Sequence, residues 1–305
     1  MEWRFKVGIQ FVLARLPGGT GLNHLLQIAN RSFTPRKVRD RVLINAEIVS
    51  RISRFVPLRD STIVDVGTGW ELIAPLLLSL FRPRAIYSFD LARHLRLSVV
   101  RKVLEQIENE IKTICVLCEL DPVEAKAKVE GWARARSLDD LLALANIVYL
   151  APGDATSTAL PGESVDLFFS REVLEHLTEP VLIDILRESK RLLKSSGVAF
   201  HAIEPGDHYA NVKAGLSRVN FLQYSERTWN FWVNNRISYH NRWRARQFLD
   251  TFTAQGARVL DLQSRTDARD LDLLHHGFKL DSKFSGLTAE ELAVNYIEVI
   301  HRFLR

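Results

Sequence analysis

Short apolar runs alternate with segments of helical periodicity through the middle of this 305-residue chain. Runs rich in Val, Ile and Phe predict strands, whereas apolar positions spaced three and four residues apart predict helices. The expected strands are residues 62–66, 85–89, 147–150, 164–170, 198–203, 257–263 and 294–303. The expected helices are residues 71–81, 92–112, 121–145, 179–194 and 245–254, with Gly197 as the stop after the helix 179–194. Such alternation is typical of an α/β fold with a parallel sheet.

Two segments lie outside this alternation and predict the domain organisation. Residues 1–59 form an expected helical N-terminal extension, and residues 60–305 form an expected Rossmann-like domain with a seven-stranded, mostly parallel sheet and flanking helices. Within that domain, residues 206–244 form an aromatic and basic insert after the fifth strand. Because insertions beyond the strand C-termini of open α/β sheets usually build the substrate site, we expect this insert on the substrate side, where it forms the acceptor cleft together with residues 1–59.

The composition is that of a folded globular chain, with 47% hydrophobic and 25% charged residues. No transmembrane helix is expected, because the longest apolar run, 72–81, has half of the roughly 20 residues that a span requires. The N-terminal stretch is interpreted as an amphipathic segment rather than a signal peptide. The only cysteines, Cys115 and Cys118, favour a reducing compartment and hence a cytoplasmic location; as a lone C-x-x-C pair they are expected to be idle thiols.

The basic charge is local. Residues 1–59 hold 11 Lys and Arg against 3 Asp and Glu, which suits a solvated helix face, a peripheral contact with membrane phosphates, or an acidic, lipid-linked or nucleotide-linked substrate. Residues 211–246 hold 7 basic residues against 1 acidic residue, interleaved with the aromatics Phe221, Tyr224, Trp229, Phe231, Trp232, Tyr239 and Trp243. This second stretch suits an anionic or sugar-like partner, or a solvated face over an aromatic core.

The strand 62–66 ends in the turn Gly67-Thr68-Gly69 and leads into a helix, which is an arrangement that receives a cofactor at the helix N-terminus. Asp90 closes the next strand and is suited to accept both hydroxyls of a ribose. Asp65 either contacts the ligand or only orients the turn. A nicotinamide dehydrogenase would need a third glycine where this chain has Leu72, so that class is disfavoured.

Three motifs in this order resemble class I S-adenosylmethionine-dependent methyltransferases: Val64 to Gly69 with Asp90, then Gly153-Asp154-Ala155, then Ser164 to Leu177. The resemblance covers roughly residues 60–205. It implies S-adenosylmethionine as cofactor, with the glycine turn at its methionine part, Asp90 at the ribose and Asp154-Ala155 flanking the adenine. The cofactor-binding residues implied are Asp65, Gly67, Thr68, Gly69, Asp90, Leu91, Asp154, Ala155 and Ser170. The chain departs from the family at Trp70-Glu71, where many members have a third small residue.

A narrower similarity is to a bacterial subgroup associated with surface-glycan and natural-product biosynthesis. It is carried by GTGWELIAPLLL, SFDLARHL, HAIEPGDHYA, NFLQYSERTWNFW and YHNRWR. This similarity implies O-methylation of a sugar, a glycan or a related small-molecule hydroxyl.

Methylation of a hydroxyl also requires a base that removes its proton. Candidate bases lie beyond the ends of the fourth and fifth strands: His176, Glu204, Asp207 and His208. We expect His208 oriented by Asp207 to act as the base, with His176 as the other catalytic candidate. His201 falls within the fifth strand, where a histidine is typically a satisfied core residue.

The cluster Glu172-x-x-Glu175-His176 suggests a divalent metal site. On a helix these three side chains would share one face, with His201 or His208 as a further ligand. The pattern resembles that of Mg²⁺-dependent O-methyltransferases, including ubiquinone-pathway enzymes and small-RNA 2′-O-methyltransferases. It also occurs in metal-free relatives, in which the glutamate caps a turn or forms a salt bridge.

Two other functions stay open. An RNA 2′-O-methyltransferase would use the insert to stack bases and contact phosphates. A noncatalytic scaffold would bind the cofactor without transferring its methyl group.

Overall fold

The computed structural model describes residues 2–18, 33–235 and 237–304, and the chain divides into two compact units. Unit 1 consists of residues 1–31, 172–183 and 201–299, and unit 2 consists of residues 32–171, 184–200 and 300–305. Part of the expected N-terminal extension, residues 1 and 19–32, lies outside the described residues, as does Arg236 of the insert. Among the described residues, no helix has the length and apolar character that a membrane span needs.

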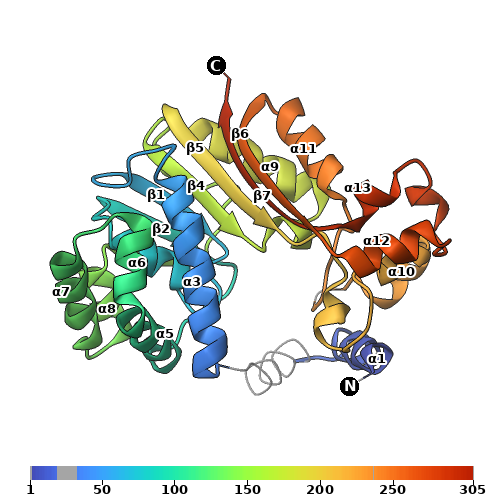
Figure 1. Cartoon of the computed structure of the whole chain (residues 1–305), viewed down its shortest axis with the longest axis horizontal. Coiled ribbons are helices and arrows are strands. Elements are labelled where there is room, and N and C mark those ends of the chain that lie inside the picture. Colours follow the sequence, from blue (N-terminus) through green and yellow to red (C-terminus); the bar gives the residue numbers. More distant parts are fainter. Residues whose placement is uncertain (1, 19–32, 236, 305) are drawn as a thin grey trace. The chain divides into compact units, whose positions relative to one another are not determined.

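The strands of the described residues form one seven-stranded sheet, in the order β3-β2-β1-β4-β5-β7-β6. Figure 1 shows this sheet. β1 pairs in parallel with β2 and with β4, and β2 pairs in parallel with β3. The strands are β1 (Thr62–Val66), β2 (Ala85–Phe89), β3 (Ile147–Leu150), β4 (Val165–Arg171), β5 (Leu193–Ile203), β6 (Ala257–Thr266) and β7 (Val294–Phe303). The predicted α/β, Rossmann-like class is confirmed.

The helices within residues 35–144 gather beside the β1–β2 part of the sheet (Figure 1). The expected helix 92–112 divides into α5 and α6, and the expected segment 121–145 divides into α7 and α8. The side chains of Asp121 and Ser137 accept N–H bonds at the first turns of α7 and α8, which fixes where these helices begin. The bounds are α3 (Pro35–Ile52), α4 (Ile73–Ser79), α5 (Leu97–Asn109), α6 (Ile111–Cys118), α7 (Pro122–Ala133) and α8 (Leu138–Leu144), with α9 (Glu179–Leu192) between β4 and β5.

Unit 1 is built on an aromatic core. The rings of Trp3, Phe221, Trp229 and Phe284 are buried together, so the N-terminal helix packs into the core of the insert. The elements are α1 (Trp3–Leu13), α10 (Glu226–Trp232), α11 (Ala245–Ala254), α12 (Ala268–His275) and α13 (Ala289–Ala293), with the 3₁₀ turns η1 (Leu174–His176), η2 (His208–Asn211), η3 (Asn220–Gln223) and η4 (Ser282–Phe284).

Gly197 does not stop a helix, and that expectation is wrong. It lies inside β5, which begins at Leu193 directly after α9. A Cβ atom on Gly197 would lie 3.0 Å from the carbonyl oxygen of Val165 and 3.1 Å from that of Asp166. The residue is therefore a glycine because β4 approaches its backbone closely.

Candidate functional site

The residues expected at the cofactor follow four neighbouring strands of unit 2. Asp154 follows β3, Asp90 follows β2, Gly67 and Gly69 follow β1, and Ser170 lies at the end of β4. These strands are neighbours in the order β3-β2-β1-β4, and their pairings are parallel, so their C-terminal ends meet at one edge of the sheet. Ligands of open α/β sheets bind at this edge.

The turn after β1 requires its two glycines. Gly67 has a φ of +80° and Gly69 a φ of +68°, a region that favours glycine. The Gly67 N–H donates to the carbonyl oxygen of Phe89 at 2.8 Å, and the Gly69 N–H donates to Oδ2 of Asp90 at 2.8 Å. Asp90 therefore fixes the turn on the neighbouring strand, which places its carboxylate and the glycine backbone side by side.

Asp65 lies beneath this turn and is 3% exposed. Its Oδ2 accepts a bond of 2.5 Å from the hydroxyl of Ser88, whose Oγ lies 2.6 Å from that of Thr68. Burial raises the pKa of Asp65 to about 7. These contacts match the second of its two expected roles, a carboxyl group that orients the turn.

The residues that depart from the methyltransferase pattern, Trp70 and Glu71, and the neighbouring Leu72 have defined places in the structure. Leu72 is fully buried and adopts a φ of +59° at the start of α4. The Trp70 ring stacks on that of His94 at 4.6 Å between centroids, and Glu71 forms an ion pair of 2.5 Å with Arg41. Within residues 67–72, Gly67 and Gly69 are thus the positions where no side chain separates a ligand from the backbone.

The remaining cofactor candidates differ in exposure. Oδ1 of Asp154 accepts from the N–H of Thr156 at 2.8 Å and from its hydroxyl at 2.6 Å, and these bonds lower the pKa of Asp154. Ala155 and Ser170 are buried, whereas Leu91 is 78% exposed. An exposed leucine beside Asp90 is suited to cover one face of a planar ring.

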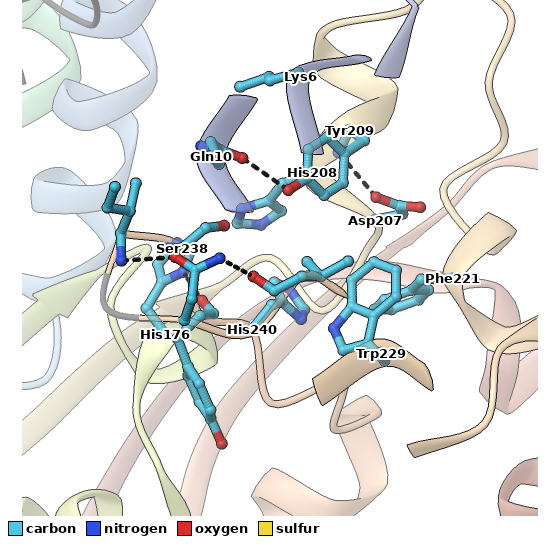
Figure 2. A pocket seen from close by; sticks show the side chains of 14 residues that line it. Lys6, Gln10, His176, Asp207, His208, Tyr209, Phe221, Trp229, Ser238 and His240 are labelled. Carbon is cyan, nitrogen blue, oxygen red and sulfur yellow. Dashed lines mark hydrogen bonds between the residues drawn. The ribbon is translucent and has the colours of Figure 1, made fainter. Parts of the chain in front are cut away.

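Unit 1 contains a cavity of about 400 Å³ that gathers the histidines of the site (Figure 2). It is lined by Lys6, Gln10, His176, Asp207, His208, Tyr209, Phe221, Trp229, Val233, Asn235, Ile237, Ser238, Tyr239 and His240. Most of these residues come from the insert 206–244, which was predicted to lie on the substrate side.

Two histidine rings in this cavity are each anchored by a backbone carbonyl. Nδ1 of His176 lies 2.9 Å from the carbonyl oxygen of Tyr239, and Nε2 of His208 lies 3.1 Å from that of Glu204. Because a carbonyl oxygen only accepts, we assign the proton to these nitrogens in the neutral rings. The lone pairs therefore reside on Nε2 of His176 and on Nδ1 of His208.

The two rings differ in their surroundings. Burial and the neighbouring His176 lower the pKa of His208 to about 4, so His208 is neutral and weakly basic at pH 7. His176 is exposed. Burial also lowers the pKa of His240, whose ring centroid lies 4.7 Å from that of His208.

The hydrogen bonds of Asp207 lead away from His208. Its Oδ1 accepts from the N–H of Tyr209 and its Oδ2 from the side-chain amide of Asn220, both at 2.8 Å. Burial raises the pKa of Asp207 to about 6. The carboxylate beside the His208 ring is that of Glu204, whose Oε2 lies 3.5 Å from Nε2 of His208. Asp207 instead shapes the turn η2 as its N-cap.

The expectation that Glu172, Glu175 and His176 lie on one face of a helix is wrong. Only residues 174–176 form a single 3₁₀ turn, and Glu172 precedes it with a φ of +56°. A left-handed residue interrupts a right-handed helix, so spacing along a helix does not apply here. His201 is fully buried in β5, with its ring 5.3 Å from that of Phe252.

A different group could hold a metal ion. Glu175, His176 and His208 each offer one ligand atom, and these atoms lie within 4.8 Å of one another. Oε1 of Glu175 accepts from the N–H of Glu204 at 3.1 Å, while Oε2 has no hydrogen-bond partner among the described residues. Burial raises the pKa of Glu175 to about 8. The donor set has two nitrogens and one carboxylate, which suits Zn²⁺ or Mn²⁺ better than Mg²⁺.

The most buried arginines of the insert region hold its loops together. Arg242 is fully buried and donates to the carbonyl oxygens of Phe221 and Tyr224 at 3.0 and 2.7 Å. Arg244 is also fully buried and donates to the carbonyl oxygens of Pro205, Leu292 and Val294. The expectation of a basic binding surface is therefore wrong for these two residues.

Lys6, Gln10 and His240 line the cavity although none of them was an individual candidate, and they lie in the segments 1–59 and 206–244 expected at the acceptor. Gln10 accepts a bond of 2.9 Å from the hydroxyl of Tyr209, which ties α1 to the insert (Figure 2). No signal in the sequence joins positions 199 residues apart. His240 belongs to the stretch YHNRWR, where the neighbouring polar residues offered a hint of a functional loop.

The two cysteines belong to unit 2. Cys115 and Cys118 are free, buried thiols of α6, and burial raises the pKa of Cys118 to about 12. A thiol with such a pKa is unreactive at neutral pH.

Residues 119–201 match the family model described as "Methyltransferase domain", which is a little over a quarter of the chain. The match spans β3, β4 and most of β5, with the Asp154 and Ser170 to Leu177 motifs. It supports the expectation of a methyltransferase that uses S-adenosylmethionine, and it specifies no acceptor.

Solved structures of methyltransferases resemble the chain at low identity. An S-adenosylmethionine-dependent methyltransferase from Mesorhizobium loti is 14% identical, with a TM-score of 0.46, over 84% of this chain and 97% of that one. A geranyl diphosphate methyltransferase in complex with S-adenosylmethionine is 11% identical, with a TM-score of 0.45, over 86% and 85%. A TehB-like methyltransferase from Corynebacterium glutamicum is 14% identical, with a TM-score of 0.41, over 85% and 88%. No curated protein matches the chain in sequence.

Proposed function

We propose that this protein is an S-adenosylmethionine-dependent O-methyltransferase whose acceptor is the hydroxyl of a sugar, a glycan or a related small molecule. The observation that carries the proposal is the anchored His176 ring, with Nδ1 held by the Tyr239 carbonyl and the lone pair of Nε2 available in a polar cavity. The methyltransferase family match supports the donor half of the reaction.

The residues after β1 and β2 fit the donor. Gly67 and Gly69 present backbone without side chains, and Asp90 offers carboxylate oxygens that accept hydrogen bonds from ribose hydroxyls. Bound S-adenosylmethionine would supply an electrophilic methyl group on a sulfonium. Since the displacement is in line, the protein's task is to align the acceptor and exclude water.

His176 is the base we propose in place of the His208–Asp207 pair. The methyl group is transferred to the acceptor oxygen, and the acceptor O–H proton passes to Nε2 of His176 and then to solvent. The C–S bond of the donor breaks, which leaves S-adenosylhomocysteine and a methyl ether. A general base of this kind contributes about 10²- to 10⁴-fold to a rate. His208, neutral at pH 7, packs beside the His176 ring at 4.9 Å.

A second form of the mechanism uses a divalent ion at Glu175, His176 and His208. The carbonyl anchors on the far nitrogens of both rings are the outer partners that metal-ligating histidines usually have. When bound, the ion would lower the pKa of the acceptor hydroxyl. Dialysis against EDTA followed by Mg²⁺, Mn²⁺ or Zn²⁺ tests this form: restored activity with one ion supports it, and undiminished activity after chelation excludes a required ion.

A small acceptor is favoured over RNA because two arginines of the basic stretch 211–246 are buried. Arg242 and Arg244 are buried on backbone carbonyls and leave fewer cations for phosphates. Acceptor binding that weakens steeply with salt would instead favour RNA.

The direct test incubates the full chain with methyl-labelled donor and fractionated extract, then identifies the product by mass spectrometry. A labelled methyl ether supports the proposal. Donor binding in calorimetry without any labelled product supports the scaffold, and label on nitrogen or carbon refutes the hydroxyl acceptor.

A further inference from the structure

Helix α1 carries two apolar stripes. Trp3 and Val7 pack in the core of unit 1, and Leu13 is also buried. Phe5, Ile9 and Val12 follow a spacing of four and three residues, so they share another side of the helix. Phe5 is 64% exposed and Val12 is 54% exposed. A second apolar face thus lies at the surface of this unit.

Helix α10 carries exposed aromatic rings that contact α1. Phe231 is 56% exposed and Trp232 is 49% exposed. The ring centroid of Phe11 in α1 lies 5.6 Å from that of Phe231 and 4.9 Å from that of Trp232. The rings of Phe11, Phe231 and Trp232 therefore form one cluster across the two helices, which we call the aromatic surface, whereas the exposed Phe5 and Val12 lie on another side of α1. Exposed patches of this kind mark interaction sites.

Cations border the aromatic surface. The guanidinium carbon of Arg15 lies 3.4 Å from the centroid of the Phe11 ring, and Arg4 is exposed on α1. The acids of the two helices are already neutralised: Glu2 pairs with Lys213 at 2.8 Å, and Glu226 pairs with Lys283 at 2.6 Å. Tryptophan and phenylalanine flanked by arginine are suited to the interface of an anionic bilayer.

An apolar groove opens beside this surface. Its volume is about 340 Å³, and its lining includes Trp3, Val7, Tyr224, Trp229 and Trp232, with Arg4. Trp229 also lines the cavity that contains His176 (Figure 2). A polar cavity and an apolar groove thus share a wall, which is the arrangement that an amphiphilic molecule with a polar head and a hydrocarbon chain requires.

We propose that the aromatic surface docks on an anionic phospholipid membrane, and that the acceptor is a lipid-linked molecule. Its hydrocarbon chain occupies the groove and its hydroxyl-bearing head occupies the His176 cavity. We choose an anionic bilayer as the partner of the aromatic surface because its apolar side chains lie beside Arg4 and Arg15, whose charge complements anionic headgroups. The acceptor class rests on the proposed methyl transfer, whereas the docking does not.

Vesicle sedimentation of the full chain tests the docking. Vesicles of phosphatidylcholine with phosphatidylglycerol should bind the chain at least about tenfold more tightly than phosphatidylcholine alone, and added salt should weaken the binding. Phe231→Ala should weaken it about tenfold and Arg15→Gln about fivefold. The matched controls are Val116→Ala, at a valine 79% exposed on α6, and Lys126→Gln on α7, whose side chain is 62% exposed; both should bind like the wild type.

Equal binding to neutral and anionic vesicles, or no binding to either, would overturn the docking. So would a dimer in sedimentation velocity that Phe231→Ala converts to monomer, because the aromatic surface would then join two copies of the chain. Circular dichroism of each variant confirms that the fold is retained, as expected for exposed side chains.

The acceptor class has its own readout. After incubation with labelled donor and extract, chloroform–methanol extraction should carry the labelled methyl ether into the organic phase. Label confined to water-soluble products refutes a lipid-linked acceptor while leaving the proposed O-methyltransferase standing. Donor binding in calorimetry reports on that function separately.

Discussion

Nδ1 of His176 and the carbonyl oxygen of Tyr239 lie 2.9 Å apart, although 63 residues separate them in the chain. This contact determines which ring nitrogen of His176 carries a proton and which is available to act as a base. The segment 237–240 of the insert therefore does more than line the cavity, because its backbone positions the ring of a residue that follows β4.

Replacing His176 by Ala should lower kcat by about 10²- to 10⁴-fold with little change in donor affinity, because a base acts on the acceptor. Steady-state kinetics and calorimetry measure the two quantities. His276→Ala is the matched control, since His276 belongs to the same unit, is exposed and lies outside the cavity. Wild-type rates in H176A would remove His176 from the reaction.

Replacing Asp90 by Ala should weaken donor binding by about 10- to 100-fold, because the ribose loses its acceptor and the Gly69 N–H loses its bond of 2.8 Å. D90N keeps an acceptor for Gly69 and should lose less. Isothermal calorimetry with the donor measures both variants, with the exposed Asp139 replaced by Ala as control. An affinity for D90A equal to that of wild type contradicts a cofactor role for this residue.

The burial of Asp65 predicts a pH-dependent stability. Its folded pKa of about 7 exceeds the ordinary value of 3.8, so between these values the folded state holds a proton that the unfolded state releases. The free energy of unfolding therefore falls as the pH rises through this range. D65N should remove a slope of up to about 1.4 kcal/mol per pH unit. Urea unfolding from pH 4.5 to 8 measures it; parallel curves for D65N and wild type would show that Asp65 does not titrate in this range.

Arg244 should be essential for the stability of unit 1. Arg244→Met leaves three carbonyl oxygens, those of Pro205, Leu292 and Val294, without their donor and should destabilise the fold by about 3 kcal/mol. Arg246, two residues away, forms ion pairs at the surface, so Arg246→Met should change the melting temperature much less. Thermal unfolding of both variants provides the comparison, and equal melting temperatures would show that the buried bonds of Arg244 contribute little.

The sequence by itself determined the elements and their class. The strands 62–66, 85–89, 147–150 and 294–303 have the bounds that their apolar runs predict, because a strand buried in a sheet needs consecutive apolar residues. The glycine turn and Asp90 were likewise predictable, since strand ends and positive-φ positions are local features.

The tertiary structure alone decided which polar side chains meet. Asp207 and His208 are adjacent in sequence, yet Asp207 binds Asn220 while His208 is anchored by Glu204 and packs beside His176 and His240. The charges of Arg242 and Arg244 predicted a basic binding surface. In the folded chain both side chains are buried and donate to backbone carbonyl oxygens. Hydrogen-bond partners and burial depend on segments brought together across tens of residues, and no local pattern encodes that geometry.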